Sequence, residues 1–502
     1  MHHTGFFYVK KSILIYLNPV TMKKIVCILF LILCFSGKAQ QKSEALTEKE
    51  ILFLMDKSAA DLLKEAKANS VSVGVVKDGK TYTKHYGEID KGKGNTATNA
   101  TTFEVASITK LFTGLLVAQA VLEKKINLDD DIRKYITGDY PNLEYEGKAI
   151  RFRDLLSFRT GFSHDLPDNS EIRKNINDTS YLAFKRLDDS YNKATFFQGL
   201  HAMKLDTLPG KKFKYSNGSV QLTAHILENV YHKNYETLLK ENIFDKLALN
   251  DTQLHLSPNT IIANGYNSKN ILMPNLSDNL WGAAGGIKST LGDLVKLLAF
   301  ELDTKNKLAV ESQRNLLDSE TMWNGYFWDG IEVSGFGKNS WKHGGAFGTQ
   351  NMFLVYPESK LGISVIVNVS DQNTSSAIGH AAAKLALALL PVKESQKGIY
   401  GYKIKGNSVQ FTYEYNTFFN SDLVKSVSVA GSFNNWNTED KNYQMIRKNK
   451  NTFELSVPVC NFKKDYPNTF KFVINKTGWV EAPENISNKE NSGDKNLILK
   501  LY

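Results

Sequence analysis

Cysteine is scarce in this chain, with three residues among 502. Cys27 and Cys34 lie in an N-terminal segment with the features of a cleaved leader, so the mature chain would keep Cys460 alone. A single cysteine cannot form an internal disulfide. The folded protein must therefore be stabilised by its packed cores.

Long hydrophobic runs are also missing beyond the N-terminus, where no stretch reaches about 20 apolar residues. Two lysines precede an apolar segment over Ile25–Phe35, and the small residues up to Ala39 are typical of a cleavage site. We therefore expect residues 1–39 to be upstream residues plus a signal peptide cut near Ala39, with export to the periplasm or beyond the cell. The alternatives are a retained anchor and, less favoured because of the bulky Leu33, lipidation of Cys34.

A stripe of one charge is absent as well. The formal net charge is +10, and five lysines with no acidic residue precede Gln40, so the mature value falls to +5. Basic residues are mixed with acidic ones, as in Asp129–Lys134, and no basic row could follow a phosphate backbone. We therefore expect no nucleic-acid partner.

Two predicted β-hairpins enclose a helical middle. Alternating apolar residues around the turn pair Asp78–Gly79 predict one hairpin over residues 70–86, and a second is predicted over residues 350–369. Between them the apolar spacing becomes helical, and an Ala- and Leu-rich helix over residues 375–390 follows. This order indicates an α+β domain with one antiparallel sheet and a helical lobe.

The composition changes after Pro391. Residues 392–406 are charged and contain glycine, as in a linker, and short segments with aromatic residues follow. Four of these segments fit strands, namely Ser408–Tyr415, Val424–Ala430, Thr452–Val457 and Thr469–Asn475. We expect a separate all-β module of about 100 residues here.

Ser107 and Lys110 form a Ser-x-x-Lys motif at the start of an apolar-periodic helix. Three residues along a helix is about one turn, so the two side chains share a face. A hydroxyl becomes a nucleophile when a nearby base takes its proton, and a lysine can be that base once burial or a second positive charge lowers its pKa. The ordinary alternative is a surface serine and lysine.

Tyr215 and Asn217 lie in a loop before a second predicted helix. A phenol there could relay a proton, and the amide could hold Lys110 and a substrate carbonyl. The plain alternative is an Asn-capped helix start with a half-buried tyrosine.

A third motif, His343-Gly344-Gly345, precedes the second hairpin. Adjacent glycines allow a substrate to approach the backbone closely. The backbone N–H of Ala346 could then join that of Ser107 as an oxyanion hole. A glycine bulge with a solvated histidine is the alternative.

Together these motifs resemble the beta-lactamase-like serine hydrolases, the group that contains class C beta-lactamases, D-aminopeptidases and related esterases. The resemblance covers residues 44–392 and includes, in family order, Phe103–Thr113, Tyr215–Gly218 and Gly282–Thr290 with Asp293. It implies a beta-lactamase/transpeptidase-like domain in which Ser107 is acylated, Lys110 is the base, Tyr215 relays the proton and the amides of Ser107 and Ala346 form the oxyanion hole. We expect neither a cofactor nor a metal.

Two positions depart from the family pattern. Phe158 stands where the family usually carries histidine, and His343-Gly344-Gly345 stands where beta-lactamases usually have Lys-Thr-Gly. A neutral histidine supplies less charge than an ammonium for binding a substrate carboxylate. The resemblance to esterases and aminopeptidases is therefore closer than that to beta-lactamases, and we expect poor hydrolysis of penicillins and cephalosporins.

Residues 403–502 resemble the glycogen-binding type of carbohydrate-binding module, an immunoglobulin-like sandwich. The resemblance rests on Val427–Asn437 and on Phe470–Val480. Indole rings stack on the apolar faces of sugars, so the expected site for an α-glucan consists of Trp436, Lys471, Trp479 and Asn496. The alternatives are that the tryptophans belong to the core and that the module is a docking or spacer domain.

The leading hypothesis is a secreted serine hydrolase that acts on an ester or amide of a small molecule or peptide through an acyl-enzyme. The alternative is a catalytically silent protein that binds carbohydrate or cell wall. The intact Ser107, Lys110 and Tyr215 favour the enzyme.

Overall fold

The computed structural model describes residues 46–390 and 400–501, except for 178, 259, 261, 278, 320, 321, 335, 416–423, 450, 465–467, 484, 485 and 491–493. The expected signal peptide and most of the expected linker lie outside the described residues.

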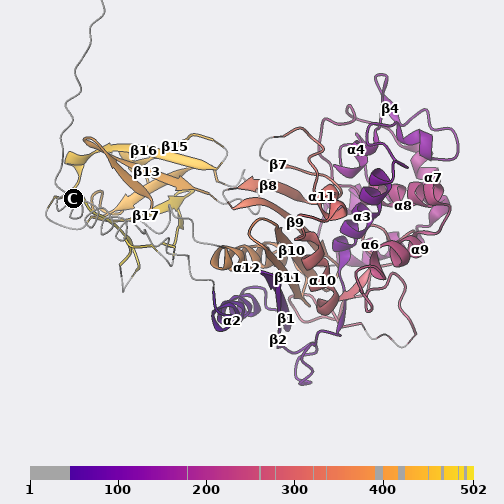
Figure 1. Ribbon diagram of the computed structural model, residues 1–502, viewed down its shortest axis with the longest axis horizontal. Coiled ribbons are helices and arrows are strands. Elements are labelled where there is room, and N and C mark those ends of the chain that lie inside the picture. The colour runs from indigo at the N-terminus through magenta and orange to yellow at the C-terminus, as the bar shows by residue number, and fades with distance from the viewer. Residues whose placement is uncertain are drawn as a thin grey trace, which may run out of the picture. The chain divides into compact units, whose positions relative to one another are not determined.

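A seven-stranded antiparallel sheet forms the centre of the first part, in the order β2-β1-β11-β10-β9-β8-β7 (Figure 1). Its strands are β1 (Ser70–Lys77), β2 (Lys80–Gly87), β7 (Met322–Trp323), β8 (Gly330–Ser334), β9 (Gly337–Gly345), β10 (Gln350–Tyr356) and β11 (Leu361–Val367). The first hairpin and the last one pair through β1 and β11. The two hairpins therefore lie side by side in this sheet although they are far apart in the sequence, and both predicted hairpins are confirmed.

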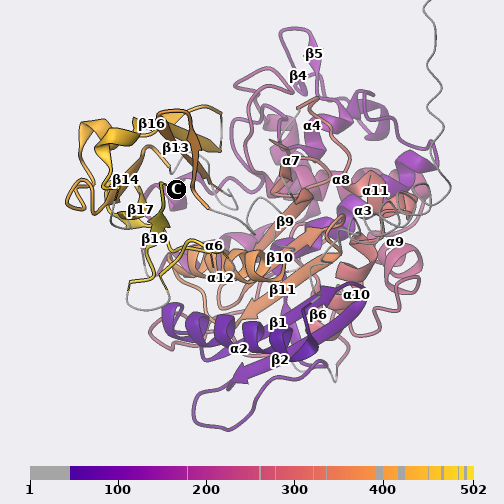
Figure 2. The ribbon, with the colours of Figure 1, turned by 60° about the vertical axis from the view of Figure 1, so that its left-hand side comes forward.

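Helices cover both faces of this sheet. Helices α2 (Glu48–Glu65) and α12 (Thr374–Leu389) pack on one face, and α10 (Leu291–Glu301) packs on the other (Figure 2). Strands β10 and β11 are buried at every position, which explains why their sequences are almost continuously apolar. The predicted helix over residues 375–390 is confirmed as α12.

The helical lobe is built around α3 (Thr109–Leu122), which is buried on nearly all sides. Its other helices are α4 (Phe152–Leu156), α5 (Ser170–Lys174), α6 (Ser180–Ser190), α7 (Lys193–Ala202), α8 (Asn217–Tyr231), α9 (Tyr235–Leu239) and α11 (Lys307–Ser312). Two short strand pairs, β3 (Thr102–Glu104) with β6 (Lys288–Thr290) and β4 (Glu144–Tyr145) with β5 (Lys148–Ala149), complete this part. The α+β class and the helical lobe are thereby confirmed.

The second part consists of two four-stranded antiparallel sheets. One contains β12 (Tyr402–Lys405), β13 (Ser408–Glu414), β16 (Thr452–Pro458) and β15 (Ile446–Arg447), and the other contains β14 (Val427–Gly431), β17 (Asn468–Ile474), β18 (Gly478–Trp479) and β19 (Leu497–Leu499). Phe411 and Tyr413 of the first sheet pack on Phe470 and Phe472 of the second, with ring centroids 5.1 and 5.0 Å apart. The four predicted strands are present, and the immunoglobulin-like assignment remains a prediction.

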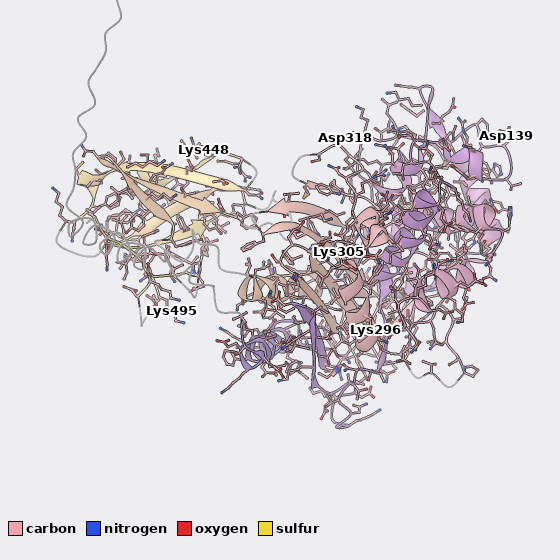
Figure 3. The ribbon with its side chains drawn as sticks, viewed as in Figure 1. Asp139, Lys296, Lys305, Asp318, Lys448 and Lys495 are labelled. Carbon is pink, nitrogen blue, oxygen red and sulfur yellow. The ribbon has the colours of Figure 1, made fainter. Side chains whose placement is uncertain are left out.

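Charged side chains of both signs stand on the outside of the first part. Figure 3 labels Asp139, Lys296, Lys305 and Asp318 there, all of them exposed. Among the described residues, no helix combines the length and apolar character that crossing a membrane requires. Cys460 is an exposed free thiol.

Candidate active site

Ser107 lies in a tight turn between the short strand β3 and helix α3. Strand β3 is fixed by pairing with β6, and the turn Ala106–Ile108 leads directly into α3. Ala106 has a φ of +47°, in the left-handed region that residues other than glycine rarely adopt. Such backbone strain occurs often at functional sites, and here it immediately precedes the candidate nucleophile.

Lys110 is fully buried, and its amine contacts three oxygens. The distances from Nζ are 2.9 Å to Ser107 Oγ, 2.8 Å to Asn217 Oδ1 and 2.5 Å to the Ala284 carbonyl. A neutral amine has two N–H groups and one lone pair. In that neutral form the two N–H groups would donate to the oxygens of Asn217 and Ala284, which are only acceptors, and the lone pair would face the Ser107 hydroxyl.

Burial holds the pKa of Lys110 well below its ordinary value, and the positive charge of Lys342 lowers it further. The carboxylates of Asp329 and Asp165 oppose this effect. The sequence analysis required burial or a second positive charge, and the structure has both. Together they favour the neutral amine that a general base requires.

Tyr215 places its hydroxyl 2.8 Å from Ser107 Oγ. Its ring stacks on Phe158, with centroids 4.7 Å apart, and Lys110 Nζ and Lys342 Nζ lie 4.9 and 5.1 Å from the ring centroid. The residue is 37 % exposed, but desolvation and the charge of Asp329 raise the pKa of the hydroxyl. The phenol is therefore protonated at neutral pH and can pass on a proton. Phe158, at the position where the family usually has histidine, supports this ring.

Asp165 fixes the loop that carries Tyr215 and Asn217. Its carboxylate accepts hydrogen bonds from the Ser216 hydroxyl at 2.8 Å and from the backbone N–H groups of Asn217 at 3.1 Å and Gly218 at 2.9 Å. These N–H groups belong to the first turn of α8, where a carboxylate is favoured by the helix dipole. The loop is thereby held beside Ser107 although 108 residues separate Tyr215 from it.

In the segment around His343-Gly344-Gly345, the structure places Lys342 and Gly344, and not His343, on the face of β9 toward Ser107. Side chains alternate along β9, and a Cβ on Gly344 would lie 2.3 Å from the Val105 carbonyl, so Gly344 faces the turn that holds Ser107. Lys342 shares that face. His343 faces the opposite side, where its imidazole contacts the Gln350 amide and burial lowers its pKa. Lys342-His343-Gly344 is therefore the segment that lies beside Ser107.

The backbone N–H of Ala346, the expected oxyanion donor, already has an acceptor within the protein. It donates to the Thr349 carbonyl at 2.9 Å, within the turn between β9 and β10. The N–H of His343 points away from β10, because it donates to Asp329 Oδ2 at 2.7 Å. Backbone N–H groups alternate in direction along an antiparallel strand, so the N–H of Gly345 also points away from β10. Gly345 therefore replaces Ala346 as the candidate for the second donor.

The predicted carbohydrate site in the second part is brought together only partly. Trp436 and Trp479 lie side by side, with ring centroids 6.1 Å apart and an angle of 53° between the rings. Lys471 lies 3.5 Å from Glu481, and Asn496 donates to Glu490 at 2.9 Å. The two polar side chains are mostly buried, whereas Trp479 is exposed. The structure thus offers a pair of neighbouring indoles.

The described residues contain no group of three or more His, Cys, Asp or Glu side chains placed to hold a metal ion. Sequence reasoning missed three residues of the candidate site: Lys342, Asp165 and Asp329. The spacing Lys342-x-Gly344 was a usable signal for the first of them. No short sequence motif marked the two aspartates, because each contacts residues that are distant in the sequence or belong to another element.

Comparisons with known proteins give one family. The sequence pattern described as Beta-lactamase matches residues 55–388. Protein flp of Staphylococcus aureus strain N315 is 25 % identical over 342 residues, which are 65 % of this chain and 65 % of that protein. A beta-lactamase of Psychrobacter immobilis is 24 % identical over 268 residues, which are 52 % of this chain and 61 % of that protein. The chain thus spans less than two thirds of the length of these curated relatives.

Proposed function

The chain belongs to the beta-lactamase family, and from this membership we propose that it is a serine hydrolase whose nucleophile is Ser107. One observation carries the proposal: a buried amine and a phenol both lie within 3 Å of the Ser107 hydroxyl, at 2.9 and 2.8 Å. Two proton-transfer groups on one hydroxyl form the arrangement that nucleophilic catalysis by serine requires.

In the proposed reaction, neutral Lys110 takes the proton of Ser107 as Oγ forms a bond to the substrate carbonyl carbon. The carbonyl oxygen becomes an oxyanion, which the N–H groups of Ser107 and Gly345 stabilise. When the bond to the leaving group breaks, Tyr215 gives that group its proton and recovers one from Lys110. Water then attacks the acyl-enzyme along the reverse path and releases the acid.

The proposed substrates are esters or amides of small molecules or peptides, of the esterase or D-amino-acid peptidase type. We also propose that the enzyme is exported after removal of the segment that ends near Ala39. Hydrolysis of short-chain p-nitrophenyl esters by the purified chain tests the activity itself. A chain with no turnover of esters or D-amino-acid amides would favour the silent binding protein instead.

Tyr215→Phe is expected to lower kcat by on the order of 10²-fold, because the ring and its packing on Phe158 remain while the proton relay is lost. The matched control is Tyr235→Phe, which removes the hydroxyl of a buried tyrosine, hydrogen-bonded to Thr113 at 2.7 Å. The control should keep full activity. Equal rates for Tyr215→Phe and the unaltered chain would show that the Tyr215 hydroxyl relays no proton and that the residue only packs in the site.

We further propose that the paired indoles of the second part bind α-glucan by stacking. The full chain should be retarded in a gel that contains glycogen or amylose, and the double substitution Trp436→Ala and Trp479→Ala should abolish the retardation, because stacking supplies much of the contact. Phe53→Ala, which removes an exposed aromatic ring from α2, is the control and should change nothing. Unretarded migration of the unaltered chain would favour a docking or spacer module.

A further inference from the structure

The positive charge beside Ser107 is neutralised within the protein. Lys342 Nζ lies 2.5 Å from Asp329 Oδ1, and the side chain of Lys342 is 0 % exposed, whereas that of Asp329 is 25 % exposed. The ammonium is enclosed further by the rings of Phe158 and Tyr215, 5.7 and 5.1 Å away. A molecule that approaches this ion pair from solvent therefore meets the carboxylate and not the ammonium.

Asp329 is held firmly in this position. Its carboxylate also accepts the backbone N–H of His343 at 2.7 Å, and its own N–H donates to the Trp341 carbonyl at 3.1 Å. The Asn324 side chain donates to the Asp329 carbonyl. Because residues of β9 hold both its backbone and its side chain, Asp329 cannot move away from Lys342 without breaking several hydrogen bonds.

These contacts matter for the choice of substrate. A lysine on this face of β9 could bind a substrate carboxylate through a charge-assisted hydrogen bond if its charge were free. Here that place is already taken by the carboxylate of Asp329, and an incoming carboxylate would be placed next to a like charge. Juxtaposed like charges suppress binding of the wrong partner. Asp165, whose charge also acts on Lys110 and Tyr215, adds to the negative field.

We propose that Asp329 is a specificity-determining residue that occupies the anion position beside Ser107 and so restricts the enzyme to acyl substrates without a nearby carboxylate. This inference rests on the proposed hydrolase function. It also gives a physical reason to expect poor turnover of penicillins and cephalosporins, and this reason does not depend on the absence of a lysine.

The test compares two esters that share one leaving group, p-nitrophenyl butyrate and the anionic mono-p-nitrophenyl glutarate. Selectivity is the kcat/KM of the neutral ester divided by that of the anionic ester, and this ratio cancels any change in the reactivity of Ser107 or Lys110. Asp329→Asn should lower the ratio by on the order of tenfold, since the ammonium of Lys342 becomes the nearest charge. Adding Lys342→Met to that variant should return the ratio to an intermediate value.

A second measurement needs no variant. Salt screens the repulsion between exposed charges, and the Debye length is about 10 Å at an ionic strength of 0.1 M. The selectivity of the unaltered chain should therefore decrease as the ionic strength rises from about 0.02 to about 0.5 M. A ratio that stays the same in Asp329→Asn, or that does not respond to salt in the unaltered chain, overturns the inference. Absence of turnover of both esters by the unaltered chain would instead contradict the proposed function.

Discussion

Ser107→Ala is expected to lower kcat for p-nitrophenyl butyrate by on the order of 10⁴-fold or more, because no other group can form the acyl-enzyme at this place. The substitution removes one oxygen from a turn whose backbone is fixed by β3 and α3. The folded state should therefore be kept. Steady-state hydrolysis and thermal unfolding of the same preparation measure the two effects together.

Ser359→Ala is the matched control for this variant. Ser359 lies in the turn between β10 and β11, where its hydroxyl donates to the Phe336 carbonyl at 3.1 Å. Its loss should leave the rate unchanged. A Ser107→Ala protein that is folded and still hydrolyses the ester at a comparable rate would contradict the assignment of Ser107 as the nucleophile.

Lys110→Met is expected to lower kcat/KM by on the order of 10³-fold, because Ser107 would lose its general base. In the unaltered chain kcat/KM should rise with pH as Lys110 loses its proton, with a midpoint well below the ordinary lysine value, since burial and Lys342 lower this pKa. The residual activity of the methionine variant should lack that rise. A pH series of initial rates for both proteins provides the measurement.

Lys338→Met serves as the control for Lys110→Met. Burial lowers the pKa of Lys338 as well, but its charge is balanced by Glu358 and Glu301, and it lies at the other end of β9 from Gly345. This control should keep both the rate and its pH dependence. If the two methionine variants lost activity to the same degree, loss of a buried lysine in general would explain the result, and Lys110 would not be the base.

The parts of the fold that depend on local pattern could be predicted from the sequence. Alternation around Asp78–Gly79 gave β1 and β2, and the apolar spacing after Ser107 gave α3. The contact of Ser107 with Lys110 also followed, because helix geometry alone brings residues three positions apart together. What remained open was how distant segments meet.

Strand β9 shows why the contacts between distant segments could not be predicted from the sequence. Side chains alternate between the two faces of a strand, so a shift of one residue in the assumed correspondence exchanges every side chain between the faces. The sequence motif predicted a role in the site for His343, whereas the structure places Lys342 and Gly344 toward Ser107. The same alternation makes Gly345, and not Ala346, the proposed oxyanion donor.

The aspartates illustrate a different limit. Asp165 acts on the first turn of α8, about 50 positions later in the chain, and Asp329 acts on Lys342 across two paired strands. Neither belongs to a short motif, since their roles arise from packing between elements. The roles of such residues can be identified only from the tertiary structure, because it shows which distant residues they contact.

The central claim, that Ser107 is a nucleophile activated by Lys110 and Tyr215, is tested most directly by covalent labelling. The chain would be treated with a fluorophosphonate, digested, and searched by mass spectrometry for the modified peptide. We predict one phosphonylated residue, Ser107, with labelling abolished in Ser107→Ala and strongly slowed in Lys110→Met. An unlabelled chain, or a label on a serine outside this site, would contradict the account.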